Sequence, residues 1–253
     1  MARSLQAATS SIADRIVAIR DRWHTKNHPF FRVMAEGKLP LKALARYQAL
    51  HYQYVARAAP SFGVLYARAY QYEDVRKMIA ENVAEEEGLK AIDRPGHEAH
   101  DHNELIFRFC RAAGMSEAEV RNVKMTPAWW ARSLYYYHVT TTEPVGVALA
   151  MQTTQEGQMP ALMNEVVLPA FEKHYGFKRN APEIEFFTEH AEADEEHSRK
   201  QIELCEKYCD TPELVDRALA AAQQAVELRW ASISDVYRSD VLGERDLLPA
   251  GVA

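Results

Sequence analysis

Helical periodicity is the feature that most limits what this chain of 253 residues can fold into. Apolar residues recur three and four positions apart in segment after segment, which is the spacing of one helix face. Glycine is scarce, with 10 residues, and runs that alternate apolar and polar side chains are hard to find. The sequence therefore predicts an all-α chain.

The breaks in this pattern give approximate helix bounds. We expect helices over residues 10–23, 40–59, 62–71, 74–90, 100–113, 127–142, 144–154, 158–175, 182–208 and 211–238. Ser116 is expected to cap one helix, and Thr211 another, with Pro212 at its first position. No stretch resembles an interdomain linker and no segment repeats, so we expect one domain over residues 1–253 with a core of about 15–238.

Composition excludes several classes of partner. The net charge of −6 argues against a nucleic-acid surface, which normally leaves a basic footprint. No segment approaches the roughly 18 uncharged apolar residues of a membrane span, and charged residues interrupt the N-terminal segment where a secretory signal would be apolar. The odd set of Cys110, Cys205 and Cys209 fits packed thiols in a reducing compartment. We expect a cytoplasmic protein that binds neither nucleic acid nor membrane.

The stretch FFTEHAEADEEHSRKQIE, residues 186–203, places two histidines and an aspartate in one acidic run. On a continuous helix His190, Asp194 and His197 fall within an arc of about 60° and point to a common centre. Two imidazoles and a carboxylate are metal ligands. The alternative is a charged helix face in contact with solvent.

A second cluster lies upstream, in MIAENVAEEEGLK. Glu86 stands between Glu85 and Glu87, so one acid of this cluster can face inward while its neighbours face water. The alternative is a solvated helix end, because glutamate is rarely buried without a partner. The histidines of the following segment are His97, His100 and His102.

A third candidate is Glu156, the only charged residue between Pro144 and Leu162. A carboxylate in such a segment needs a cation, a metal or a hydrogen-bond donor if it is buried, and surface exposure is the alternative. Carboxylates and imidazoles on several helices of a bundle are the ligands of non-haem di-iron sites. The combination of the three segments therefore favours a metal centre over three separate solvated faces.

The order of these segments resembles the haem-oxygenase-like superfamily. The pieces that carry the resemblance are HPFFRVMAEGKLPLKALARYQALHYQYV, DVRKMIAENVAEEEG, HNELIFRFCRAAG, QEGQMP, FEKHYGF, FFTEHAEADEEHS and a closing CEKYCDTPELVDRALAAAQQAVELRWASISDVY. The resemblance covers about residues 15–238. The chain is similar to pyrroloquinoline quinone synthase-like proteins and to haem-oxygenase-like di-iron oxidases. The resemblance implies a single helical bundle and no haem.

The resemblance also implies a ligand set. Carried over by position, the metal ligands are Glu86, His102, Glu156, His190, Asp194 and His197. The loop between the first two is longer than expected. The substitutes that therefore remain open are Glu85 or Glu87 for the glutamate and His97 or His100 for the histidine.

The activity implied is that of an O₂-dependent non-haem di-iron oxidase or oxygenase in biosynthesis, with two Fe(II) per chain. Relatives oxidise amino acids, amines or fatty acids by N-oxygenation, desaturation or C–C cleavage, so we expect a small-molecule substrate, an external electron donor and a homodimer. The alternatives are a metal-free oxidase like pyrroloquinoline quinone synthase, a thiaminase-like hydrolase with a cysteine nucleophile, and a helical interaction protein without turnover. Tyrosines expected to line the pocket or to pack in the core are Tyr47, Tyr52, Tyr54, Tyr135, Tyr136 and Tyr137.

Overall fold

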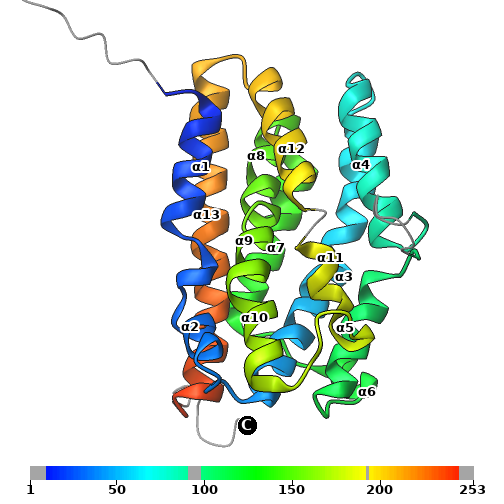
Figure 1. Ribbon diagram of the computed structural model, residues 1–253. Coiled ribbons are helices and arrows are strands. Elements are labelled where there is room, and N and C mark those ends of the chain that lie inside the picture. Colours follow the sequence, from blue (N-terminus) through cyan, green and yellow to red (C-terminus); the bar gives the residue numbers. More distant parts are fainter. Residues whose placement is uncertain (1–9, 91–97, 192–193, 245–253) are drawn as a thin grey trace, which may run out of the picture.

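The computed structural model describes residues 10–90, 98–191 and 194–244 (Figure 1). These residues form helices and no strand, with one isolated bridge between Glu87 and Asp101. The all-α prediction is confirmed, while the extent of a single domain over the whole chain stays a prediction. Of the described helices, none combines the length and the apolar character that crossing a membrane requires.

The elements comprise α-helices, two 3₁₀ turns (η1, η4) and three π-helical turns (η2, η3, η5). In chain order they are α1 (Ile12–Arg22), η1 (Thr25–Asn27), α2 (Pro29–Ala35), α3 (Leu41–Arg68), α4 (Glu73–Glu86), α5 (His102–Ala112), α6 (Glu117–Asn122), α7 (Pro127–Thr142), α8 (Val145–Glu156), α9 (Met159–Leu162), η2 (Met163–Val167), α10 (Leu168–Ala170), η3 (Phe171–Tyr175), η4 (Pro182–Ile184), α11 (Glu185–His190), α12 (Asp194–Tyr208), α13 (Pro212–Val236) and η5 (Tyr237–Val241).

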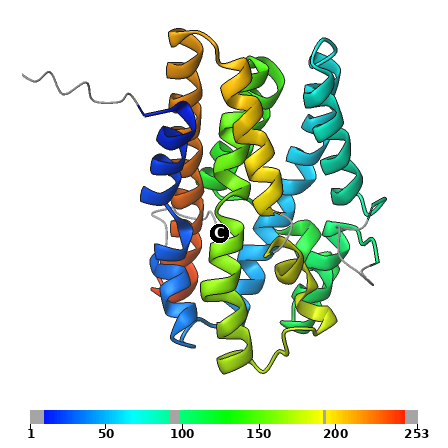
Figure 2. The same ribbon diagram turned by 45° about the horizontal axis from the view of Figure 1, so that its top comes forward.

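Helix α8 is the centre of the bundle, because its residues from Val145 to Gln155 are all buried. It packs mainly against α12 and α13, and α13 in turn packs against α1 and α7 (Figures 1 and 2). Gly146 permits the close approach at its start, since a Cβ there would lie 2.7 Å from Cys209 Sγ. Glu156 is therefore the last residue of the most enclosed helix of the molecule.

Helix α3 is one continuous helix, so the predicted division into helices 40–59 and 62–71 is wrong. Pro60 lies inside it, on an exposed face. The proline ring removes the amide that would bond to the carbonyl of Ala56, but Ala56 is also exposed, so water can satisfy that carbonyl. Packing of α3 against α7, α4 and α5 on either side of the proline outweighs the local propensity.

The predicted helix 182–208 is also wrong as a single element, because it consists of η4, α11 and α12. Helix α11 packs against α5, whereas α12 packs against α8, so the two follow different surfaces (Figure 1). The side-chain amide of Asn164 donates to the carbonyl of Ala191 at 3.2 Å, which satisfies a backbone group freed at the end of α11. His190 and His197 therefore lie on different helices, and the single-stripe argument does not apply to them.

Most of the remaining predicted helices agree with the structure to within a few residues, but 74–90 ends at Glu86. The predicted helix 158–175 consists of α9, η2, α10 and η3, so it includes two π-helical turns. Ser116 caps α6 with a capping box, and Thr211 caps α13 ahead of Pro212, as predicted. The short helices α2 and α6 were not predicted. The three cysteines are buried free thiols, as expected.

Candidate metal centre

A cavity of about 100 Å³ lies inside the bundle, several times the volume that one water molecule needs. Its walls come from α3, α4, α5, α7, α8, α9, α11, α12 and α13. The predicted ligands that line it are Glu86, His102, Glu156, His190 and His197. Of the predicted tyrosines, Tyr54 and Tyr136 line it as well. The structure thus brings together residues that are as much as 111 positions apart in the sequence, from Glu86 to His197.

Glu86, His102 and His190 form a group that could hold a metal ion, with one ligand atom from each lying within 4.8 Å of the others. His100, Glu185 and Glu189 form a second group that meets the same distance. The end of α4 and the start of α5 meet because Glu87 and Asp101 form the isolated bridge. Gly88 makes this possible, since its φ is +66° and a Cβ there would lie 2.4 Å from the amide nitrogen of Asp101. The long segment between the bridged residues therefore does not separate Glu86 from His102.

Electrostatic interactions connect Glu86 and His102 in this group and shift the pKa of each. Burial opposes a charge on Glu86, but the neighbouring His102 lowers the pKa of Glu86 to about 2. Burial likewise opposes protonation of His102, but Glu86 and Glu189 hold the pKa of His102 well above its usual value. Its Nδ1 lies 3.0 Å from Glu86 Oε2 and its Nε2 lies 3.4 Å from Glu189 Oε2. A proton on His102 here balances two carboxylates, which is the task of a metal ion in a loaded site.

The tautomer and the protonation state of His190 suit a metal ligand. Its Nδ1 lies 2.7 Å from the carbonyl oxygen of Phe186, so Nδ1 carries the proton and donates it to that bond. Burial and then the charge of His102 lower the pKa of His190 to about 4, so the ring is neutral at pH 7. Its Nε2 therefore offers a lone pair, in the orientation that a backbone acceptor commonly fixes for metal-binding histidines.

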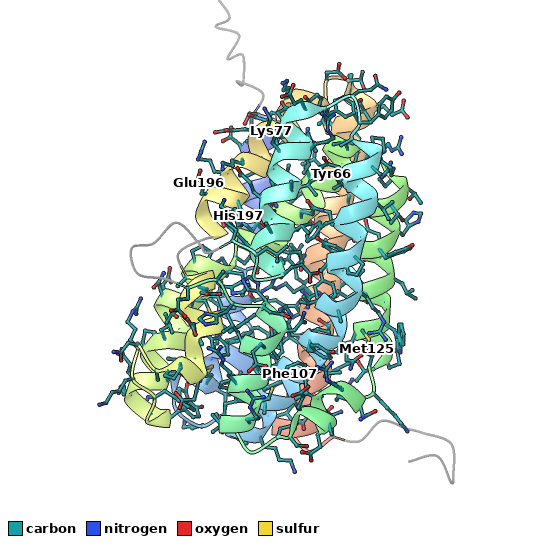
Figure 3. All side chains as sticks on the ribbon, turned by 90° about the vertical axis from the view of Figure 1, so that its right-hand side faces the viewer. Tyr66, Lys77, Phe107, Met125, Glu196 and His197 are labelled. Carbon is teal, nitrogen blue, oxygen red and sulfur yellow. The ribbon has the colours of Figure 1, made fainter. Side chains whose placement is uncertain are left out.

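His197, Glu85 and Glu156 form the rest of the polar lining. His197 Nε2 lies 2.9 Å from Glu85 Oε2, and Figure 3 shows His197 where α12 faces α4. Glu85 lines the cavity as Glu86 does, so it stays open as an alternative ligand. The Gln201 amide donates to Glu156 Oε2 at 2.8 Å, and burial raises the pKa of Glu156. A buried carboxylate with a raised pKa gains by facing a cation.

Not every candidate is placed at the cavity. The side chains of Asp194 and of the alternative His97 lie outside those that the structure describes. Glu87 is exposed, and His100 Nδ1 lies 3.3 Å from Glu185 instead. Neither Glu87 nor His100 lines the cavity.

Four further ionisable residues that line the cavity were not predicted as site residues. They are His51, Arg132, Glu189 and Arg229. Burial and then the charges of Arg132 and Arg229 hold the pKa of His51 well below its usual value, so this imidazole is neutral. Arg132 could have been predicted from the sequence, because it is the only Asp, Glu, Lys or Arg in residues 127–142. Glu189, 3% exposed, carries no such signal in its acidic segment.

The donor set fits iron. Carboxylate oxygens and imidazole nitrogens are the ligands of non-haem iron, and no thiol is among the described residues that line the cavity. The hydrolase alternative needs a cysteine nucleophile, but Cys110 is buried away from the cavity and burial raises its pKa to about 12.

Residues 45–230 match the family described as iron-containing redox enzymes. The chain belongs to this family. The predicted assignment to the oxidoreductases is thereby confirmed, and iron is the metal that the family name gives. The metal-free alternative loses its support.

Two curated relatives of this iron-containing redox enzyme share most of its length. The 4-aminobenzoate synthase of Nitrosomonas europaea is 27% identical over 236 residues, which cover 92% of this chain and 93% of the relative. The 4-aminobenzoate synthase of Chlamydia muridarum is 24% identical over 204 residues, which cover 81% of each chain.

Solved structures show the same fold. A TenA homologue from Pseudomonas syringae pv. tomato matches with a TM-score of 0.73 and 13% identity, over 90% of this chain and 93% of that one. A domain with a heme oxygenase-like fold from Shewanella denitrificans matches with a TM-score of 0.70 and 18% identity, over 89% and 90%. The predicted haem-oxygenase-like bundle is confirmed.

Proposed function

We propose that this iron-containing redox enzyme binds two irons per chain and uses them with O₂ to oxidise a small substrate in biosynthesis. The proposed ligands are Glu86, His102, Glu156, His190, Asp194 and His197. The observation that carries the proposal is that carboxylates and imidazoles from α4, α5, α8, α11 and α12 converge on one cavity. This donor number exceeds what one ion needs and leaves positions open for O₂.

The chain's own residues orient this site. Phe186 fixes the ring of His190, and Gln201 fixes the carboxylate of Glu156. Bound Fe(II) would supply electrons for the reduction of O₂, and we propose that an external donor restores them.

The name that the relatives carry supports a specific product in addition to the class of reaction. Both curated relatives carry the name 4-aminobenzoate synthase and cover most of this chain. We therefore propose 4-aminobenzoate as the product, formed in the cytoplasm, where the free thiols of the three cysteines are stable.

The test is an anaerobic titration with Fe(II), followed by exposure to O₂ with a chemical reductant present. We expect two irons per chain and O₂ consumption by the iron-loaded protein, and 4-aminobenzoate detectable by mass spectrometry when a small-molecule cell extract supplies the substrate. His190→Ala removes a ligand, so it should hold fewer irons and consume no O₂ above background. His138→Ala, on the exposed face of α7, is the matched control and should behave as the parent. Two irons retained by His190→Ala would refute the ligand assignment.

We also propose a homodimer. Helix α7 exposes an apolar stripe at three- and four-residue spacing, with Trp130 42%, Leu134 59% and Tyr137 50% exposed. Such a stripe on a folded chain is typical of an interaction surface.

A further inference from the structure

Two buried arginines reach the cavity from helices that lie outside the acidic segments of the sequence. Arg132 on α7 is 4% exposed and Arg229 on α13 is 3% exposed. Both bond to Gln155, since Arg132 Nη2 donates to its side-chain oxygen and Arg229 Nη1 to its carbonyl oxygen, each at 3.0 Å. The two guanidinium groups therefore meet at the end of α8, one residue before Glu156.

Two nitrogen atoms of the Arg132 guanidinium group are not used in hydrogen bonds with the described residues. Its Nε and Nη1 are buried and have no hydrogen-bond partner among the described residues, and no described carboxylate lies within 4 Å of it. It lies over the ring of Tyr54 at 4.1 Å and of Trp129 at 5.2 Å. Ring faces offset only part of the free energy that burying a cation costs. The Nε and Nη1 donors of Arg132 are therefore available to an anion in the cavity that Arg132 lines.

The same cavity holds the proposed metal ligands and an apolar wall. The apolar wall consists of Val55, Ala58, Phe62, Met159 and Phe186. A molecule in this cavity would therefore meet two cations, apolar side chains and the proposed metal ligands.

We propose that Arg132 and Arg229 form a carboxylate-binding subsite, so that the substrate is a small carboxylate with an apolar body. The planar fork of a guanidinium group matches a carboxylate in a bidentate contact, which a neutral amide cannot reproduce. This inference rests on the proposed function, because it names the substrate class of the same cavity. In the opposing interpretation the arginines only hold Gln155 in place.

The test compares benzoate with its neutral analogue benzamide by calorimetry at pH 7. Because a carboxylate can also bind iron, the titrations are made on protein without added metal and on protein loaded with Fe(II) under anaerobic conditions. We expect benzoate to bind about 10- to 100-fold more tightly than benzamide in both states, the value of hydrogen bonds to a charged group. Arg132→Met should abolish that preference, and Arg132→Lys should retain part of it.

The matched control is Arg57→Met on α3. The Arg57 guanidinium also lies over an aromatic ring, that of Trp130 at 4.8 Å, but it does not line the cavity. This variant should keep the full preference for benzoate. Equal affinities of the parent for benzoate and benzamide would overturn the proposal, as would equal weakening of both ligands by Arg132→Met. Should Arg132→Met fail to fold, the parent comparison alone decides.

Iron binding separates this proposal from the proposed function. Arg132→Met is expected to hold as many irons as the parent, since it removes no proposed ligand. A parent that prefers benzoate but binds no iron would refute the metal centre and leave the carboxylate subsite standing. A parent that binds two irons but does not prefer benzoate would refute the carboxylate subsite and leave the metal centre standing.

Discussion

His28 joins two helices through both nitrogens of a ring that is 1% exposed. Its Nδ1 accepts a hydrogen bond from the amide of Phe30 at 3.1 Å and so caps α2. Its Nε2 lies 3.0 Å from Ser234 Oγ on α13, and that hydroxyl donates to the carbonyl of Trp230. Nε2 therefore carries the proton. A second proton on Nδ1 would break the cap, and burial lowers the pKa of His28 to about 4.

This shift predicts a loss of stability in mild acid. The unfolded chain binds a proton at His28 near pH 6.5 and the folded chain only near pH 4, so the contribution is complete above about 6.5 and is lost as pH falls toward 4. We expect His28→Asn, which keeps an acceptor for the Phe30 amide, to reduce the stability difference between pH 7 and pH 5 by about 2 kcal/mol. Urea unfolding at both pH values measures it. Parallel pH dependence in parent and variant would contradict the argument.

For single residues, the sequence predicts a site residue when it is the one charged residue of an otherwise uncharged segment. Glu156 was found because its segment is otherwise uncharged, and the same reasoning applied to residues 127–142 selects Arg132. Glu189 could not be found in this way, because acids stand on both sides of it along the segment. Which acid of such a segment faces inward depends on how α11 packs against α5, and that is a tertiary property.

At the scale of elements, periodicity located the helices but not their continuity. Helix α3 runs through Pro60, and the predicted helix 182–208 is divided between α11 and α12. In both places the packing against partner helices decides. The segment 182–208 packs on two different neighbours, so it must change direction. Helix α3 has packing neighbours on both sides of its proline, so it can stay continuous. His190 and His197, both proposed ligands, therefore line one cavity from two helices and not from the single helical stripe that was predicted.

The turn at Gly88 gives the prediction at this scale. Gly88→Ala places a Cβ against the Asp101 backbone at a positive φ, so the ends of α4 and α5 must separate. We expect it to lower the free energy of unfolding and to weaken Fe(II) binding, because Glu86 and His102 move apart. Gly114→Ala is the matched control, with φ of +84° and open space around it. The difference in stability between the two variants should exceed about 1 kcal/mol, the cost of overpacking. Denaturant unfolding and an iron titration measure both effects, and equal losses in the two variants would count against this role of Gly88.

At the scale of the whole molecule, the apolar stripe on α7 predicts association. Leu134→Glu places a charge at its centre, where Leu134 is 59% exposed, so a dimer that buries the stripe should dissociate. We expect the mass by light scattering to fall from that of two chains to that of one, with an unchanged helical circular dichroism spectrum. Leu242→Glu, at a residue 51% exposed beyond η5, is the control and should remain dimeric. A parent that already has the mass of one chain would refute the dimer.

The proposed ligands come from five helices that belong to separate parts of the sequence, so a bound metal ties those helices together and favours only the folded state. At a free Fe(II) concentration of 100 times the dissociation constant, one site adds about 2.7 kcal/mol to the free energy of unfolding. We therefore expect anaerobic Fe(II) to raise the melting temperature by about 5–10 °C in a chain of this size. His102→Ala removes a proposed ligand and should lose most of this rise, whereas the exposed His138→Ala should keep it. Each variant is compared with and without iron, so a change in its own stability cancels. An equal rise in His102→Ala would mean that the iron binds elsewhere on the molecule.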